Sequence, residues 1–132
     1  MRREEMVLLN DLSISEILAG LFLFHGDRKF PEQAVYRLVE HLDVIAGRFE
    51  LEHTGGGELA SESIWRALSF FEMCGILEVE IPQPGEQFFR PRKEQLDSIK
   101  AMLHEEDILP RYEQVLKKLT ETFNYVILEG AM

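Results

Sequence analysis

The chain lacks the features that mark disulfide-bonded and membrane-spanning proteins. Its 132 residues include a single cysteine, Cys74, so no disulfide can form within the chain. A lone thiol is typical of a protein in the reducing cytoplasm. No stretch approaches the roughly 20 consecutive apolar residues that cross a bilayer. The apolar patch near the start, Met6 to Leu9, is too short for a signal sequence. We therefore expect a cytoplasmic protein with no membrane association.

Positive charge is also scarce. The formal net charge is −10, and acidic residues outnumber basic ones in each of the segments 1–30, 31–60, 61–92 and 93–132. Proteins that bind nucleic acids usually gather Lys and Arg on one face, because neutralised phosphates supply most of the affinity. The charge balance therefore disfavours DNA as a partner, unless a local basic patch compensates for it.

Motifs for catalysis, cofactor binding and metal binding are missing as well. The run Gly55-Gly56-Gly57 is followed by Glu58, whereas a phosphate loop needs Gly-Lys-Ser/Thr, so a flexible loop is the better interpretation. The four histidines share no metal-ligand spacing, and one cysteine cannot complete a zinc site. We expect no metal, no cofactor and no enzymatic activity, although catalytic groups can converge in space without a local motif.

Apolar periodicity predicts two helices in the first third of the chain. Ser13 and Glu16 form a capping-box pattern, and Gly26 ends the helix that follows them. Pro31 suits the first turn of a second helix, whose apolar spacing continues until Gly47. Both helices have a clear apolar stripe and should contribute to the core.

A short strand, a hairpin and three further helices are expected in the rest of the chain. Alternation around Phe49 and Leu51 indicates a short strand before the glycine run. Residues 61–75 form a third helix that is apolar almost all round. Residues 76–92, ILEVEIPQPGEQFFRPR, alternate on both sides of a Pro-Gly turn and predict a hairpin. One helix follows this hairpin, and Pro110 opens the last.

The order of helix, helix, short strand, helix and hairpin resembles the winged-helix superfamily. The likeness is carried by FFEMCGILEVEI and EQFFRPR, and it covers residues 13–92. The chain departs from the family pattern between Gly47 and Leu59, where 13 residues replace a short turn. The resemblance implies a mainly α fold with a small β-hairpin. Residues 1–92 would form a winged-helix-like domain, and residues 93–132 a C-terminal helical extension, packed on that domain or on a second subunit as a single structural unit.

Two kinds of partner fit this pattern. In the DNA-binding mode that the resemblance implies, the third helix would enter the major groove and basic residues of the hairpin would touch DNA. The acidic balance favours a protein partner docked at the hairpin instead. The adjoining Phe88 and Phe89 should point to opposite faces of their strand. The candidate partner-binding residues are Phe88, Phe89, Arg90, Arg92, Lys93 and Arg66.

Apolar helices also raise the question of self-association. The resemblance implies a homodimer, because family members with two added C-terminal helices commonly dimerise. The candidate dimerisation residues share the apolar stripe of the last helix and its tail: Tyr112, Leu116, Leu119, Phe123 and Ile127. Residues 125–128 fit either an extension of that helix or an edge strand. Trp65, Phe70 and Phe71 leave a similar choice between an enclosed central helix, which we favour, and a face that meets another chain.

The sequence therefore predicts a regulatory or scaffolding protein that is not an enzyme and acts through protein–protein interaction. A DNA-binding transcription regulator, with contacts from Arg66, Arg90, Arg92 and Lys93, is the alternative. An enzyme with no motif visible in the sequence is the third hypothesis.

Overall fold

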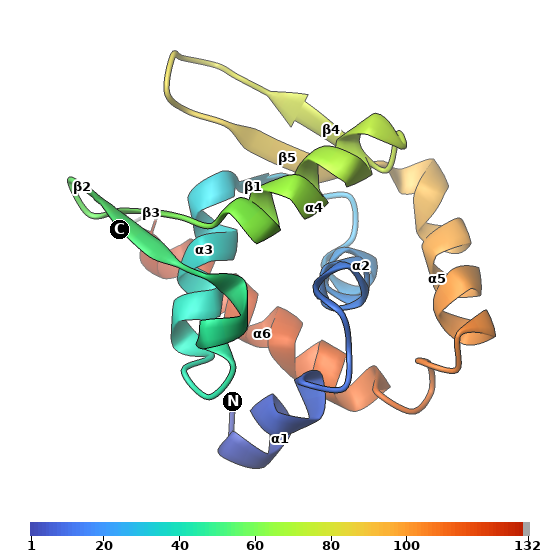
Figure 1. Cartoon of the computed structure of the whole chain (residues 1–132). Helices are drawn as coiled ribbons and strands as arrows, with labels where there is room; N and C mark the ends of the chain where they lie inside the picture. Colours follow the sequence, from blue (N-terminus) through green and yellow to red (C-terminus); the bar gives the residue numbers. More distant parts are fainter. Residues whose placement is uncertain (131–132) are drawn as a thin grey trace.

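Six α-helices and two small antiparallel sheets make up residues 1–130, the part of the chain that the computed structural model describes (Figure 1). In chain order the elements are α1 (Arg3–Leu9), α2 (Ile14–His25), β1 (Phe30–Pro31), α3 (Glu32–His41), β2 (Glu52–Gly55), β3 (Glu58–Ala60), α4 (Glu62–Met73), β4 (Leu77–Glu80), β5 (Phe88–Pro91), α5 (Leu96–Glu105) and α6 (Glu113–Gly130). Two 3₁₀ turns, η1 (Ala46–Phe49) and η2 (Lys93–Gln95), complete them. The expected helix-rich chain with a small hairpin is confirmed.

Side-chain caps start two of the helices. The backbone N–H of Glu16 donates to Ser13 Oγ at 3.1 Å, and the N–H of Ser13 donates to Glu16 Oε1 at 2.8 Å. This reciprocal pair is the predicted capping box. Ser61 caps α4 in the same way, because its Oγ accepts from the N–H of Ile64 at 3.2 Å. These bonds satisfy backbone donors that the first helical turn leaves free.

The prediction for residues 42–52 is wrong. The second helix ends at His41 rather than Gly47, and the apolar spacing continues through η1, which buries Phe49. The strand lies at Glu52–Gly55, where it pairs with β3 to form a second hairpin. All three glycines that follow His53 and Thr54 have positive φ, so they form the tight turn of this hairpin. Apolar spacing alone could not distinguish a continued helix from a 3₁₀ turn whose side chains face the same core.

A three-stranded sheet in the order β1-β5-β4 contains the predicted hairpin. Its register pairs Leu77 with Pro91 and Val79 with Phe89, so alternate side chains face the core. Phe89 is buried and Phe88 half-buried, which confirms that the two rings point to opposite faces. Strand β1 was not predicted, because it has only two residues and is held by its pairing with β5.

Aromatic rings join these elements at the centre of the molecule. The ring of Phe30 lies 5.8 Å from that of Phe22 on α2, 6.1 Å from that of Phe89 on β5 and 5.3 Å from that of Phe123 on α6. Phe22 in turn meets Phe71 of α4 edge-on at 5.3 Å. Offset and edge-on pairs of this kind are favourable beyond the area they bury. The cluster therefore fixes α2, α4, α6 and the sheet relative to one another.

The C-terminal helices belong to the same core. Helix α6 packs against α2 and α3, and α5 packs against α2. Residues 125–128 are helical, which decides between the two alternatives for this segment. The predicted extension 93–132 ends at residues 131–132, which lie outside the described residues. Helix α1 was not predicted, and it buries Met6 and Leu9.

The length and apolar character of the helices bear on whether any of them could span a membrane. Across residues 1–130, no single helix is long and apolar enough to cross a membrane, and only the pair α1 and α2, bent by 115°, passes by length and composition together.

We predict that Gly20→Val lowers the free energy of unfolding by about 1–3 kcal/mol, the usual range for an overpacked core. A Cβ at Gly20 would lie 2.7 Å from both Cδ atoms of Leu116, whose side chain is fully buried between α2 and α6. Chemical denaturation measures the change. The matched control is Gly47→Val, because a Cβ there meets nothing within 4 Å. Equal loss in the two variants would contradict the close contact of α2 and α6.

Candidate functional site

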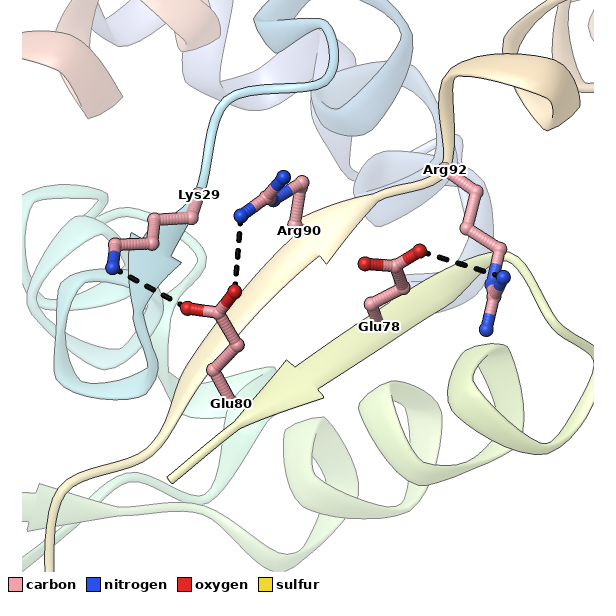
Figure 2. Close-up of polar contacts among 5 residues, drawn as sticks. All are labelled: Lys29, Glu78, Glu80, Arg90 and Arg92. Atoms are coloured by element: carbon pink, nitrogen blue, oxygen red, sulfur yellow. Dashed lines mark hydrogen bonds and ion pairs between the residues drawn. The ribbon is translucent and has the colours of Figure 1, made fainter. Parts of the chain in front are cut away.

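The outer face of the β4–β5 hairpin carries a network of ion pairs (Figure 2). Glu80 accepts from Arg90 Nη2 at 3.0 Å and from Lys29 Nζ at 3.3 Å. Arg92 Nη1 lies 3.4 Å from Glu78 Oε1. All these side chains are about half exposed, so each pair contributes only about 0–1 kcal/mol to stability.

This pairing bears on the predicted contacts to DNA. Arg92 also lies 3.8 Å from Glu94, and on α4 Arg66 binds Glu62 at 2.6 Å. Three of the four basic candidates therefore already face carboxylates. The fourth, Lys93, is exposed and has no ion-pair partner within residues 1–130. A phosphate would have to displace a glutamate from each arginine, and the displaced carboxylate would repel it.

The two phenylalanines of the candidate site differ in access. Phe89 is buried in the aromatic cluster, so its place in the partner-binding set is corrected. Phe88 is half-buried, and the Lys29 ammonium lies 5.1 Å from its ring centroid, within the range of a cation–π contact. Only Phe88 of the pair is accessible to a partner.

The candidate dimerisation residues require a correction too. Leu116, Leu119 and Phe123 are buried within a single chain, because α6 turns them toward α2 and α3. Tyr112, which directly precedes α6, is buried as well, and its hydroxyl donates to Asp11 Oδ2 at 3.2 Å. Ile127 is partly buried and lines a cleft. These side chains therefore offer no surface to a second copy, whereas dimerisation itself stays a prediction. The exposed apolar residues of α6 are Tyr125 and Leu128.

The largest unpredicted feature is the outer face of α4. Phe71 packs inward, as do Ile64, Ala67 and Leu68. Trp65 is 41% exposed, Phe70 58% and Met73 86%. The favoured interpretation of an enclosed helix is therefore wrong for one side of it. The sequence did show that the helix is apolar all round, but that pattern could not show which side the core would leave uncovered.

A hollow of about 460 Å³ lies beside Trp65. Its lining includes the four carboxylates of Glu32, Glu50, Glu52 and Glu62 and no basic side chain. The other lining residues are Tyr36, Ala60, Ser61, Trp65 and Gln87. Tyr36 donates its hydroxyl to Glu32 Oε1 at 2.7 Å. Burial, together with this bond to a carboxylate, raises the pKa of Tyr36 well above its ordinary value, so the phenol stays protonated. The hollow is therefore negatively charged at neutral pH.

The hollow continues into a larger cleft of about 770 Å³ between α3 and the two hairpins. Glu32, Tyr36, Ala60 and Gln87 line both spaces. Gln33 fixes one wall, because its side-chain amide exchanges two hydrogen bonds of 3.0 Å with the backbone of Leu59. The cleft is thus a built feature of the fold, and the hollow connects it to Trp65 of α4.

The histidine and cysteine side chains lie outside the lining of the cleft. Among residues 1–130, no three His, Cys, Asp or Glu side chains are placed to hold a metal ion. Cys74 is exposed at the end of α4. His25 is buried, with its ring 5.5 Å from that of Phe30 and 5.3 Å from that of Phe123. Neither side chain lines the cleft, so neither is placed to act on a molecule bound there.

Comparisons with known proteins give no further guide. No family model, no curated protein and no solved structure matches the chain.

We predict that protonation of His25 destabilises the fold. The backbone carbonyl of Arg28 accepts from Nε2 at 3.0 Å, which leaves Nδ1 unprotonated 3.4 Å from the Arg28 guanidinium. Burial, and then the Arg28 charge, lower the pKa of His25 below its ordinary value of 6.5. The unfolded chain therefore binds this proton first, and the free energy of unfolding falls as the pH drops through 6.5 toward the lowered folded pKa.

Denaturation at about pH 7.5 and about pH 5.5 tests this expectation. His25→Gln should lose part of the stability difference between the two pH values, and the exposed-site control His104→Gln should keep it. An unchanged pH dependence in His25→Gln would contradict the assignment.

Proposed function

We propose that this protein is a regulatory or scaffolding module without enzymatic activity, and that it docks a protein partner on the outer face of α4. The observation that carries the proposal is the exposure of Trp65, Phe70 and Met73 on one helix. Aromatic residues and methionine are enriched in the buried centres of protein interfaces, and tryptophan is prominent among the residues that dominate binding energy. An exposed set of this kind gains free energy when a partner covers it.

We infer a winged-helix-like arrangement for residues 13–92. Support comes from the order of α2, α3 and α4, and from the β4–β5 hairpin that directly follows α4. The segment between Gly47 and Leu59, where the chain departs from the family pattern, is formed by η1 and the β2–β3 hairpin. In this arrangement α4 corresponds to the helix that a DNA-binding member would insert into the major groove. The proposal assigns the same helix to a protein.

Duplex DNA as the partner has less support. Besides its apolar residues, the exposed face of α4 presents Glu62, Glu72 and only one basic side chain, Arg66, which Glu62 already binds. Lys93, at the start of η2 just after the hairpin, adds an ammonium with no ion-pair partner within residues 1–130, which is the one observation that favours DNA. A single unpaired cation supplies little of the counterion release on which binding to DNA depends.

An enzyme has the least support of the three hypotheses. The cleft is large enough for a small molecule, but neither histidine nor cysteine is among its lining residues. Its tyrosine, Tyr36, is engaged with Glu32 and holds its proton firmly. The side chains most often used for proton transfer near neutral pH therefore give no support to an enzymatic role of the cleft.

We predict that replacing Phe70 and Met73 together by Ser abolishes the capture of a specific protein from extracts of the native host. Loss of such contacts should cost about 2 kcal/mol or more, which is about 30-fold in Kd. Both side chains are mostly exposed, so the melting temperature should hardly change. The matched control replaces Tyr125 and Leu128 of α6 by Ser, and it should capture the same protein as the parent.

Two outcomes would overturn the proposal. One is that the α4 variant retains the partner as well as the parent does. The other is micromolar or tighter binding of the parent to random duplex DNA at physiological salt, weakened by Arg90→Ala and Arg92→Ala. That second result would place the DNA-binding regulator first.

A further inference from the structure

Trp65 and Met73 belong to one straight stripe along α4. Trp65, Ser69 and Met73 follow one another at intervals of four residues, so they lie on the same side of the helix. With a rise of 1.5 Å per residue the stripe is about 12 Å long. Phe70 borders the Met73 end of this stripe, because the two residues are three apart on the helix. A partner helix of two to three turns would cover this length.

The Trp65 end of the stripe opens onto the acidic hollow. Of the four carboxylates there, Glu62 is paired with Arg66, and Glu32 accepts the hydroxyl of Tyr36. Glu50 and Glu52 are exposed, and neither forms an ion pair with any residue from 1 to 130. Two unneutralised carboxylates therefore border the same hollow as a half-exposed indole ring.

We infer that the outer face of α4 binds a basic amphipathic helix of a partner protein. Its apolar side covers the stripe from Trp65 to Met73, and one of its lysine or arginine side chains enters the hollow. This inference rests on the proposed function and adds the chemistry of the partner to it. A helix laid in an apolar groove is a common mode of peptide recognition.

Charge complementarity selects this occupant. A cation in the hollow gains from the face of Trp65, the aromatic ring that binds cations best, and from Glu50 and Glu52 together. The net charge of −10 would also speed the approach of a basic chain. A second copy of this chain is a poor occupant, because it would bring equal acidic charge to the same face. A nucleic acid would be repelled for the same reason.

The methionine at the far end of the stripe suits a partner that varies in shape. Met73 is unbranched, almost fully exposed and polarizable, so it can adapt to different apolar side chains. In this inference Trp65 and the carboxylates determine the charge of the partner that binds, whereas Phe70 and Met73 supply apolar contact area.

Trp65 itself provides the measurement, because it is the one tryptophan in the sequence. The probe is a short helical peptide of leucine and lysine without aromatic residues, and the comparison peptide has glutamate in place of every lysine. Titration of the parent with the lysine peptide should shift the Trp65 emission to shorter wavelength and reach saturation. The glutamate peptide should bind at least about tenfold more weakly.

Matched variants separate the hollow from the overall charge. Glu50→Gln with Glu52→Gln should weaken binding of the lysine peptide about tenfold, because the neutral amides remove the two carboxylates of the hollow that have no ion-pair partner among residues 1–130. The control, Glu105→Gln with Glu106→Gln, changes the net charge by the same amount at exposed positions. These positions lie at the end of α5, on the opposite side of the molecule from the β2–β3 hairpin (Figure 1). This control should leave the affinity nearly unchanged.

The outcomes distinguish the inference from the proposed function. If both peptides bind equally and Phe70→Ser with Met73→Ser abolishes both, the docking face stands and the basic partner is overturned. If the two glutamine variants weaken binding equally, attraction is unspecific and the inference fails. Absence of binding by the lysine peptide also overturns it. The inference is also overturned if the parent self-associates and this shifts the Trp65 emission without any peptide, because a second copy of the chain then covers the face.

Discussion

The packing of rings around Phe30 is the constraint on which the other features depend. Phe22 and Phe123 contact it from α2 and α6, and Phe89 contacts it from β5. Because Phe89 must point into this cluster, its neighbours Phe88 and Arg90 point to the other face of the strand, where Arg90 forms an ion pair with Glu80. Because Phe71 packs edge-on against Phe22, the opposite side of α4 faces solvent. The exposed surfaces that bear on function thus follow from how the core is filled.

Those two surfaces differ in what they offer a partner. Each exposed ion pair of the hairpin contributes about 0–1 kcal/mol, and its arginines already face glutamates that a phosphate would have to displace. Burial of one large apolar side chain of α4 contributes roughly 1.5–3 kcal/mol. The apolar face therefore dominates the free energy available for binding, and the glutamates beside Trp65 determine which charge a partner should carry. This comparison supports the proposal of a partner on α4 rather than on the hairpin that the sequence favours.

Local patterns predicted the elements that local interactions determine. The capping box at Ser13 and the opposite orientations of Phe88 and Phe89 depend on neighbouring residues alone. Strand β1, in contrast, exists only through its pairing with β5. The stripe of Leu116 and its neighbours has the same spacing whether α2 or a second chain covers it, so the sequence could not decide between them. The ion pairs of the hairpin also depend on strand register, which brings Glu80 within reach of Arg90 and Glu78 within reach of Arg92.

The central claim is that the outer face of α4 contacts another protein. A photo-crosslinking amino acid in place of Phe70, introduced in the native host and compared with the same group in place of Tyr125, tests it most directly. The account predicts one discrete adduct of this chain with a different protein from the α4 position and none of that size from the α6 position. Equal adducts from both positions, a dimer of this chain, or no adduct from the α4 position would contradict it.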